Sequence, residues 1–326
     1  MAFLKIGVAA VLFALAGCAT EADEPALTDD EVGAEGAAKR PAYGVVTVER
    51  TEGAGVSRAS VSAKFMRVAP TDRQLAEDVV SARAVVPAAG ECATLSSLEG
   101  LGVTRLAAAL EGADGASALP QGFNVELLDV GDVSLVVHEG DHTPQALVPL
   151  SPRAFPDVGD LASGVFYTTP DATVPLPQPA TTSAYELTSS GATAVDAFLL
   201  DVGSMPERPS DLSVDGVEID GLSAPVDASH ELTIGWRKSD AELIYVDVLG
   251  ASAFRCSFAD AGSAVLPSGV LSDVDRGAEI TVAVHRVTER LVQLRRSADT
   301  AADVDLEGAE ARVRFDLASA IRLSVK

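Results

Sequence analysis

The chain has 326 residues, and its 48 acidic residues against 24 Lys and Arg give a formal net charge of −24. Such acidity repels the phosphates of nucleic acids and the headgroups of anionic lipids, so it argues against a nucleic-acid partner. It suits solubility outside the cell, or a surface that collects divalent cations. A chain of this length can bury a substantial core and more often forms two domains than one.

The first eighteen residues have the layout of a secretory signal. Lys5 supplies a cation, residues 6–15 form an apolar run, and the small residues Ala16 and Gly17 precede Cys18. This order of charge, apolar run and small residues is typical of a signal peptide. The run is too short to span a bilayer comfortably, so the sequence predicts export.

The stretch Leu15-Ala16-Gly17-Cys18 resembles the lipobox of bacterial lipoproteins. The resemblance implies that residues 1–17 are removed, that the Cys18 sulfur receives a diacylglycerol, and that the new amino group is acylated. Several acyl chains give stable membrane attachment where one does not. Ala19, in place of Asp, favours the outer membrane by the same resemblance. The alternatives are an ordinary signal peptide cut elsewhere and a short buried hydrophobic segment.

Residues 18–40 are expected to form an acidic flexible tether. They are rich in Ala, Glu, Asp and Gly and have no apolar period, as in segments that remain solvated. A flexible chain of this length spans about 25 Å. The tether would hold a folded body clear of the lipid headgroups.

From residue 41 onward, apolar residues mostly alternate with polar ones, as in 61–65 and 123–127. A period of two is typical of half-buried strands. Short helices are expected only at 73–80 and 105–112. The predicted fold class is therefore mainly β, an antiparallel β-sandwich arranged as two packed β domains with few short helices.

Two prolines in "MPERPSD" (205–211) separate two strand-rich stretches. They predict an N-terminal β domain over 41–205 and a C-terminal β domain over 206–326. The end of the chain is expected to form a hairpin, with residues 313–317 opposite residues 321–325. Short strands separated by turns suggest a sandwich for this half.

Two resemblances concern the C-terminal half. Trp236 on an early strand, followed by "YVDVLG" and "ITVAVHR", resembles a fibronectin type III or immunoglobulin-like domain. The lipobox, the acidic tether and "FRCSFADAGSAVLPSGVL" together are similar to uncharacterised Gram-negative lipoproteins. That second resemblance implies no known activity.

Lipidation of Cys18 would leave two cysteines, Cys92 and Cys256. An oxidising periplasm permits a disulfide between them. The alternative is a pair of buried thiols that behave as small hydrophobic residues.

"HEGDH" contains His138-Glu139 and His142, the His-Glu-x-x-His spacing of zinc peptidases. That spacing places both imidazoles on one face only in a helix. Here the preceding residues alternate as a strand, and the following Pro144 disfavours a helix. We therefore predict a hairpin with residues 139–141 as its loop and two solvent-facing histidines. Weak transition-metal binding by His138 and His142 is the alternative.

The remaining histidines are His230 and His285, and the alternation around His285 places it on the surface. No cofactor is expected. The sequence favours a membrane-anchored envelope lipoprotein with a non-catalytic binding or structural role, acting with a protein or another envelope partner that is not identifiable from the residues. The alternative is a hydrolase whose active site is assembled from dispersed residues.

Overall fold

The computed structural model describes residues 42–80, 85–98, 123–139, 143–155, 162–170, 184–193, 195–219, 223–227, 229–241, 243–272, 274–297 and 308–326. The predicted signal peptide, Cys18, the tether, the helix at 105–112 and His142 lie outside these residues. The chain from Lys39 onward forms one compact unit. In the described parts, no helix is both long and apolar enough to cross a membrane.

The prediction of a mainly β fold is confirmed. The first half contains β1 (Ala42–Gly53), β2 (Val56–Arg67), η1 (Pro70–Asp72), α1 (Arg73–Val79), β3 (Cys92–Thr94), β4 (Val125–Leu127), β5 (Val133–Glu139), β6 (Thr143–Ala154), β7 (Ala162–Thr168), β8 (Ala184–Ser189) and β9 (Phe198–Ser204). The second half contains β10 (Ser213–Val214), β11 (Val217–Glu218), β12 (Ala224–Val226), β13 (Leu232–Gly235), β14 (Leu243–Leu249), β15 (Ala253–Phe258), β16 (Ser263–Leu266), η2 (Ser268–Val270), β17 (Glu279–Gln293), β18 (Arg295–Arg296) and β19 (Glu310–Val325).

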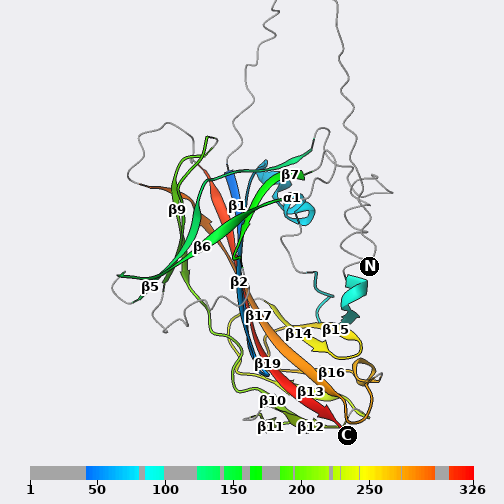
Figure 1. The fold of residues 1–326 in the computed structure, drawn as a ribbon. Helices are drawn as coiled ribbons and strands as arrows, with labels where there is room; N and C mark the ends of the chain where they lie inside the picture. Colours follow the sequence, from blue (N-terminus) through cyan, green and yellow to red (C-terminus); the bar gives the residue numbers. More distant parts are fainter. Residues whose placement is uncertain are drawn as a thin grey trace, which may run out of the picture. The chain divides into compact units, whose positions relative to one another are not determined.

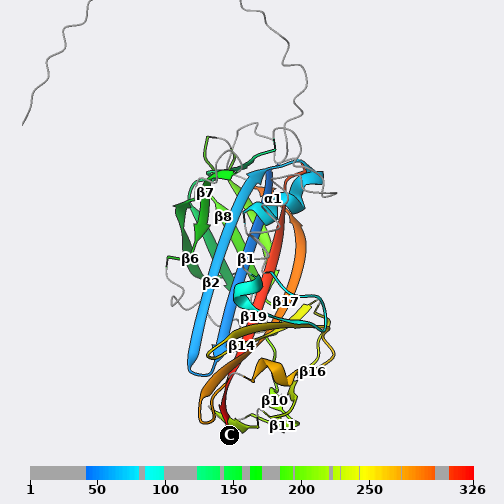
Figure 2. The ribbon, with the colours of Figure 1, turned by 90° about the vertical axis from the view of Figure 1, so that its right-hand side faces the viewer.

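Figure 2 shows the long strands β2, β1, β19 and β17 side by side. β17 and β19 are antiparallel along their whole length, from Glu279 opposite Ser324 to Gln293 opposite Glu310. β1 is parallel to β19, from Tyr43 opposite Glu310 to Gly53 opposite Ala320. The sheet is therefore mixed: β1–β19, β12–β19 and β4–β7 are parallel pairs, whereas the other neighbouring strands are antiparallel, as the sequence predicts. Parallel neighbours require a long connection, and here nearly the whole described chain separates β1 from β19.

The end of the chain is one strand, and the expected hairpin at residues 313–325 is wrong. Alternate residues on one face of β19 stay buried from Ala311 to Val325. The residues midway, 318–320, are Ala-Ser-Ala and carry none of the Gly, Pro, Asn or Asp residues that a tight turn requires. With no turn signal, the period of two continues through the whole segment.

The first hydrophobic core lies inside a sheet that curls on itself. After β17, the chain passes through Leu294 into β18, which pairs with β9. β9 is joined to β1 and β2 through β8, β5, β6 and β7, so the sheet closes (Figure 1). The enclosed aromatic side chains are Phe65, Tyr167, Tyr185, Phe198 and Phe315.

The second core lies between two sheets. A smaller sheet, in the order β11-β10-β13-β16, shares a core with β14, β15, β17 and β19. Trp236, directly after β13, is part of this core. The predicted border at 205/206 falls between the strands of the two cores, but β17 and β19 belong to both. The two predicted β domains thus share their longest strands.

Candidate functional site

The two cores meet at Ser319, in the middle of β19. Phe315 and Leu317 on one side of it belong to the first core, and Ile321 and Leu323 on the other side belong to the second. Ser319 occupies the same face and is buried. Its hydroxyl donates a hydrogen bond to the Pro209 carbonyl at 2.5 Å. The junction of the cores is therefore a polar layer that holds the linker following β9.

Arg286 on β17 is the second buried polar group of this layer, with 2% of its surface exposed. Its guanidinium donates to the carbonyl oxygens of Glu207 (3.0 Å) and Arg237, and lies 3.6 Å from the Asp260 carboxylate. Burial lowers the pKa of Arg286. The contacts join β17 to the linker and to the segment after β13.

Asp260 is positioned by hydrogen bonds as well as by this ion pair. Trp236 Nε1 donates to it at 2.7 Å, and the Ser239 hydroxyl donates at 2.9 Å. Burial alone would raise the pKa of Asp260, but these hydrogen bonds and Arg286 outweigh burial and lower the pKa. The carboxylate therefore stays ionised beside the guanidinium.

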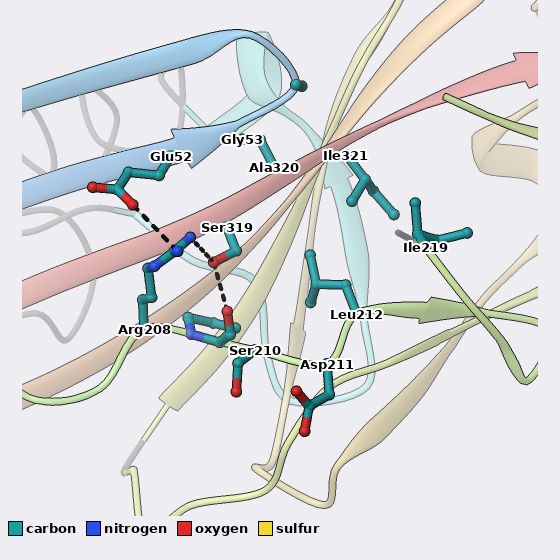
Figure 3. Close-up of a pocket in the computed structure, with 12 residues that line it drawn as sticks. Glu52, Gly53, Arg208, Ser210, Asp211, Leu212, Ile219, Ser319, Ala320 and Ile321 are labelled. Carbon is teal, nitrogen blue, oxygen red and sulfur yellow. Dashed lines mark hydrogen bonds and ion pairs between the residues drawn. The ribbon is translucent and has the colours of Figure 1, made fainter. Parts of the chain in front are cut away.

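A cleft of about 420 Å³ opens beside this layer (Figure 3). Its lining comes from the tip of the β1–β2 hairpin, the linker after β9, Ile219, and the middle of β19. The Arg208 guanidinium lies in it, 3.3 Å from a Glu52 carboxylate oxygen, and donates to Ser319 Oγ at 3.2 Å. The Arg208 side chain is 49% exposed and the Glu52 side chain 14%.

Both carboxylates that line the cleft are ion-paired. Glu52 accepts from Arg50 Nε at 2.6 Å as well as contacting Arg208, so one carboxylate is shared by two guanidiniums. Asp211, on the linker, is paired with Arg237 at 2.8 Å. Arg208 is thus the one arginine among the residues that line the cleft, and both carboxylates of the lining also pair with an arginine outside it.

Apolar side chains form the other wall. Leu212 and Ile321 are nearly buried, and Ile219 is close by (Figure 3). The edge of the cleft depends on Gly53, which has a φ of +104° and lies opposite Ala320. A Cβ at this position would lie 2.1 Å from the Ala320 carbonyl oxygen, so only glycine lets the hairpin tip approach β19. The cleft combines a cationic group with an aliphatic wall.

A separate polar cluster lies on the opposite face of β14, β17 and β19. His285 Nδ1 is 2.8 Å from Asp316 Oδ1, and its Nε2 is 3.7 Å from Asp247 Oδ2. The imidazole stacks on Tyr245 at 4.2 Å between ring centroids. The Arg255 guanidinium carbon lies 4.2 Å from the centroid of the same Tyr245 ring. The surface position expected for His285 is wrong, because its side chain is only 15% exposed.

The electrostatics of this cluster follow from its burial. Burial would raise the pKa of Asp316, but the hydrogen bond and charge of His285, with Tyr245 and Arg314, outweigh it and lower that pKa. Burial, followed by the nearby Asp316 charge, raises the pKa of Tyr245 well above its usual value. The Tyr245 hydroxyl donates to Asp316.

Cys92 and Cys256 form a disulfide, with 4.0 Å between their Cα atoms. The bond joins β3 to β15, and these strands also pair in the sheet. The next residue before Cys256 is Arg255, which forms two hydrogen bonds with Asp247 and donates to the Val85 carbonyl at 3.2 Å. Of the two alternatives left open by the sequence, the structure has the bonded pair.

The "HEGDH" segment begins at the end of β5, which pairs with β6. His138 and Glu139 are the last residues of β5, and Glu139 lies opposite Thr143 of β6. Glu139 therefore belongs to β5, and the predicted loop of 139–141 is wrong at its first residue. A zinc peptidase needs the His-Glu-x-x-His residues on a helix, whereas His138 and Glu139 lie on a strand. His142 is outside the described residues.

His138 is less exposed than predicted. Its side chain is 16% exposed, and Nε2 lies 3.8 Å from a Glu186 oxygen on the neighbouring β8. His230 lies 3.7 Å from Asp215 and 3.8 Å from Asp227, on an exposed loop. Within the described parts of the chain, no three His, Cys, Asp or Glu side chains are grouped to hold a metal ion.

Sequence reasoning did not identify the cleft. Two signals for it exist in the sequence: Ser319 interrupts an otherwise apolar face, and "MPERPSD" carries an arginine between two prolines. Neither signal predicts that Glu52 joins them, since Glu52 is far away in the chain.

Comparisons with known proteins do not extend this description: the chain matches no family model, no curated protein and no solved structure.

Proposed function

We propose that the protein is an envelope lipoprotein, anchored by lipid on Cys18, whose β body has a non-catalytic binding role. The observation that carries the proposal is the stretch Leu15-Ala16-Gly17-Cys18, placed after a cation and an apolar run. The disulfide between Cys92 and Cys256 supports it, because such bonds persist mainly in oxidising compartments. The outer membrane, by way of Ala19, is part of the same proposal.

The cleft supports a binding role for the body. Ligand sites are typically concave, largely apolar, and provided with a few polar groups that orient the ligand. The cleft at Arg208 has an aliphatic wall and one half-exposed guanidinium. Its volume is in the range of sites that take small molecules.

A hydrolase is the competing proposal, and His285 would be its most suitable base. A general base needs a ring nitrogen that can reach the proton it removes. Both nitrogens of His285 face carboxylates, those of Asp316 and Asp247, and the ring is stacked on Tyr245. The arrangement resembles a buried structural network more than a site open to substrate, and it favours the non-catalytic proposal.

The proposal is tested by mass spectrometry of the mature N-terminus. We expect Cys18 to be the first residue and to carry a diacylglycerol and an amide-linked acyl chain. Cys18→Ala is the matched variant, and it should leave the chain without lipid and release the body from the membrane fraction. A mature chain that begins after Ala19 with no lipid would overturn the anchor.

A further inference from the structure

We propose that the cleft beside Ser319 binds an organic carboxylate that carries a short aliphatic group, with Arg208 as the residue that binds the carboxylate. This inference rests on the proposed binding role of the body and not on the lipid anchor. It assigns the chemical class of the ligand.

The charge argument comes first. Glu52 also pairs with Arg50, and Asp211 pairs with Arg237, so each carboxylate of the lining is compensated by an arginine outside the lining, and Arg208 is the cation that the lining presents. Two of the Arg208 nitrogens are held by Glu52 and Ser319, which fixes the guanidinium in place. A planar guanidinium that is held and half exposed suits the two oxygens of a carboxylate.

The shape argument selects the rest of the ligand. Leu212, Ile219 and Ile321 lie together on the side of the cleft away from Glu52 (Figure 3). An inorganic anion would leave this wall in contact with water, whereas an aliphatic group next to the carboxylate would bury it. The volume of about 420 Å³ suits a small ligand.

Two sources share this chemistry: a free short-chain acid and the C-terminus of a peptide that ends in an aliphatic residue. The test is calorimetric titration of the full chain with hexanoate and, separately, with acetyl-Ala-Leu. Hexan-1-ol and acetate are the matched probes, since one lacks the charge and the other lacks the chain. We expect saturable binding of at least one carboxylate probe, and the tighter of the two identifies the source. We expect the affinities of hexan-1-ol and of acetate each to be lower than that of the tighter carboxylate probe by about tenfold or more.

The variants separate the two parts of the cleft. Arg208→Gln should weaken binding of the carboxylate probe about tenfold or more, because it removes a charge-assisted contact. Ile219→Ser should weaken hexanoate while leaving the weak binding of acetate unchanged. Arg295 is an exposed residue of β18, and Arg295→Gln is the control that should bind as the wild type does.

Three results would overturn the inference: no saturable binding of either carboxylate, hexan-1-ol binding as tightly as hexanoate, or unchanged affinity in Arg208→Gln. Each of these would leave lipid on Cys18 unaffected, so failure of the ligand assignment is distinct from failure of the anchor. Because the Arg208 side chain is half exposed, we expect the Arg208→Gln variant to fold. A circular dichroism spectrum of each variant checks that weak binding does not result from unfolding.

Discussion

Arg286 illustrates how single polar residues organise a body made mainly of apolar alternation. It occupies an inward-facing position of β17, where its neighbours Val282 and Val284 are core residues. A buried cation is tolerated only when its hydrogen-bonding groups are satisfied. Here both terminal nitrogens donate to backbone carbonyls and the Asp260 carboxylate, 3.6 Å from Nε, balances the charge; the linker between the two cores is held in return.

Replacing Arg286 by Met should destabilise the protein by roughly 3–5 kcal/mol, since it leaves the Asp260 charge and several carbonyls unpaired. The measurement is the free energy of unfolding in urea. Arg295→Met, at an exposed position, should change it by no more than about 0.5 kcal/mol. Equal stability of the two variants would show that the Arg286 contacts contribute nothing.

The four tyrosines are predicted to titrate abnormally. Burial is the largest cause in each case; it raises the pKa to about 12 for Tyr43, Tyr167 and Tyr185, and raises the pKa of Tyr245 well above its usual value. Because the phenols stay protonated in the folded chain, they contribute stability below pH 10 that is lost as the pH rises toward 12. Ultraviolet absorbance should show almost no phenolate near pH 10 in the native protein, whereas in urea about half of the tyrosine side chains should be ionised at that pH. A native step at pH 10 would contradict the burial of these side chains.

At the scale of elements, β19 shows what a period of two can and cannot predict. Its alternation places Val313, Phe315, Ile321 and Leu323 on one buried face, as the sequence indicates. The same alternation is compatible with one long strand or with a hairpin, because both put alternate residues on one side. The absence of turn-forming residues at 318–320 favours the single long strand over the hairpin.

The close approach of the β1–β2 hairpin tip to β19 can be tested by substitution of Gly53. Gly53→Ala should destabilise the protein by more than Gly90→Ala does. Both glycines have positive φ, which costs roughly 1–3 kcal/mol for other residues. Only at Gly53 would the new Cβ also meet a backbone oxygen, that of Ala320. Thermal unfolding of the two variants measures the difference, and equal losses would mean that the hairpin tip does not approach β19 this closely.

At the scale of the whole molecule, contacts between distant segments decide the arrangement. β1 and β19, near opposite ends of the chain, pair along eleven consecutive positions from Tyr43 to Gly53. The disulfide spans a sequence separation of 164 residues and attaches β3 to the edge of the same sheet. The strand pairing and the disulfide each link segments that are distant in the sequence.

Reducing the disulfide should lower the free energy of unfolding by up to about 5 kcal/mol, because a loop of this length gains much conformational entropy when released. Thiol titration of freshly purified, denatured and unreduced protein should detect no thiol from Cys92 or Cys256. The double variant Cys92→Ser, Cys256→Ser is the comparison for stability. Two reactive thiols in the unreduced wild type would contradict the bonded pair.

The sequence by itself determined the mainly β class, the short helix at 73–80, the hairpin at "HEGDH" and the apolar faces of the strands. Each of these depends on residues close together in the chain, where alternation and turn residues act directly. Tertiary structure decided which strands pair, that β19 runs parallel to β1, and that Glu52, Arg208 and Ser319 meet in one cleft. Alternation specifies which face of a strand is buried but not its neighbour, because any strand with a matching apolar face presents the same hydrogen-bonding backbone.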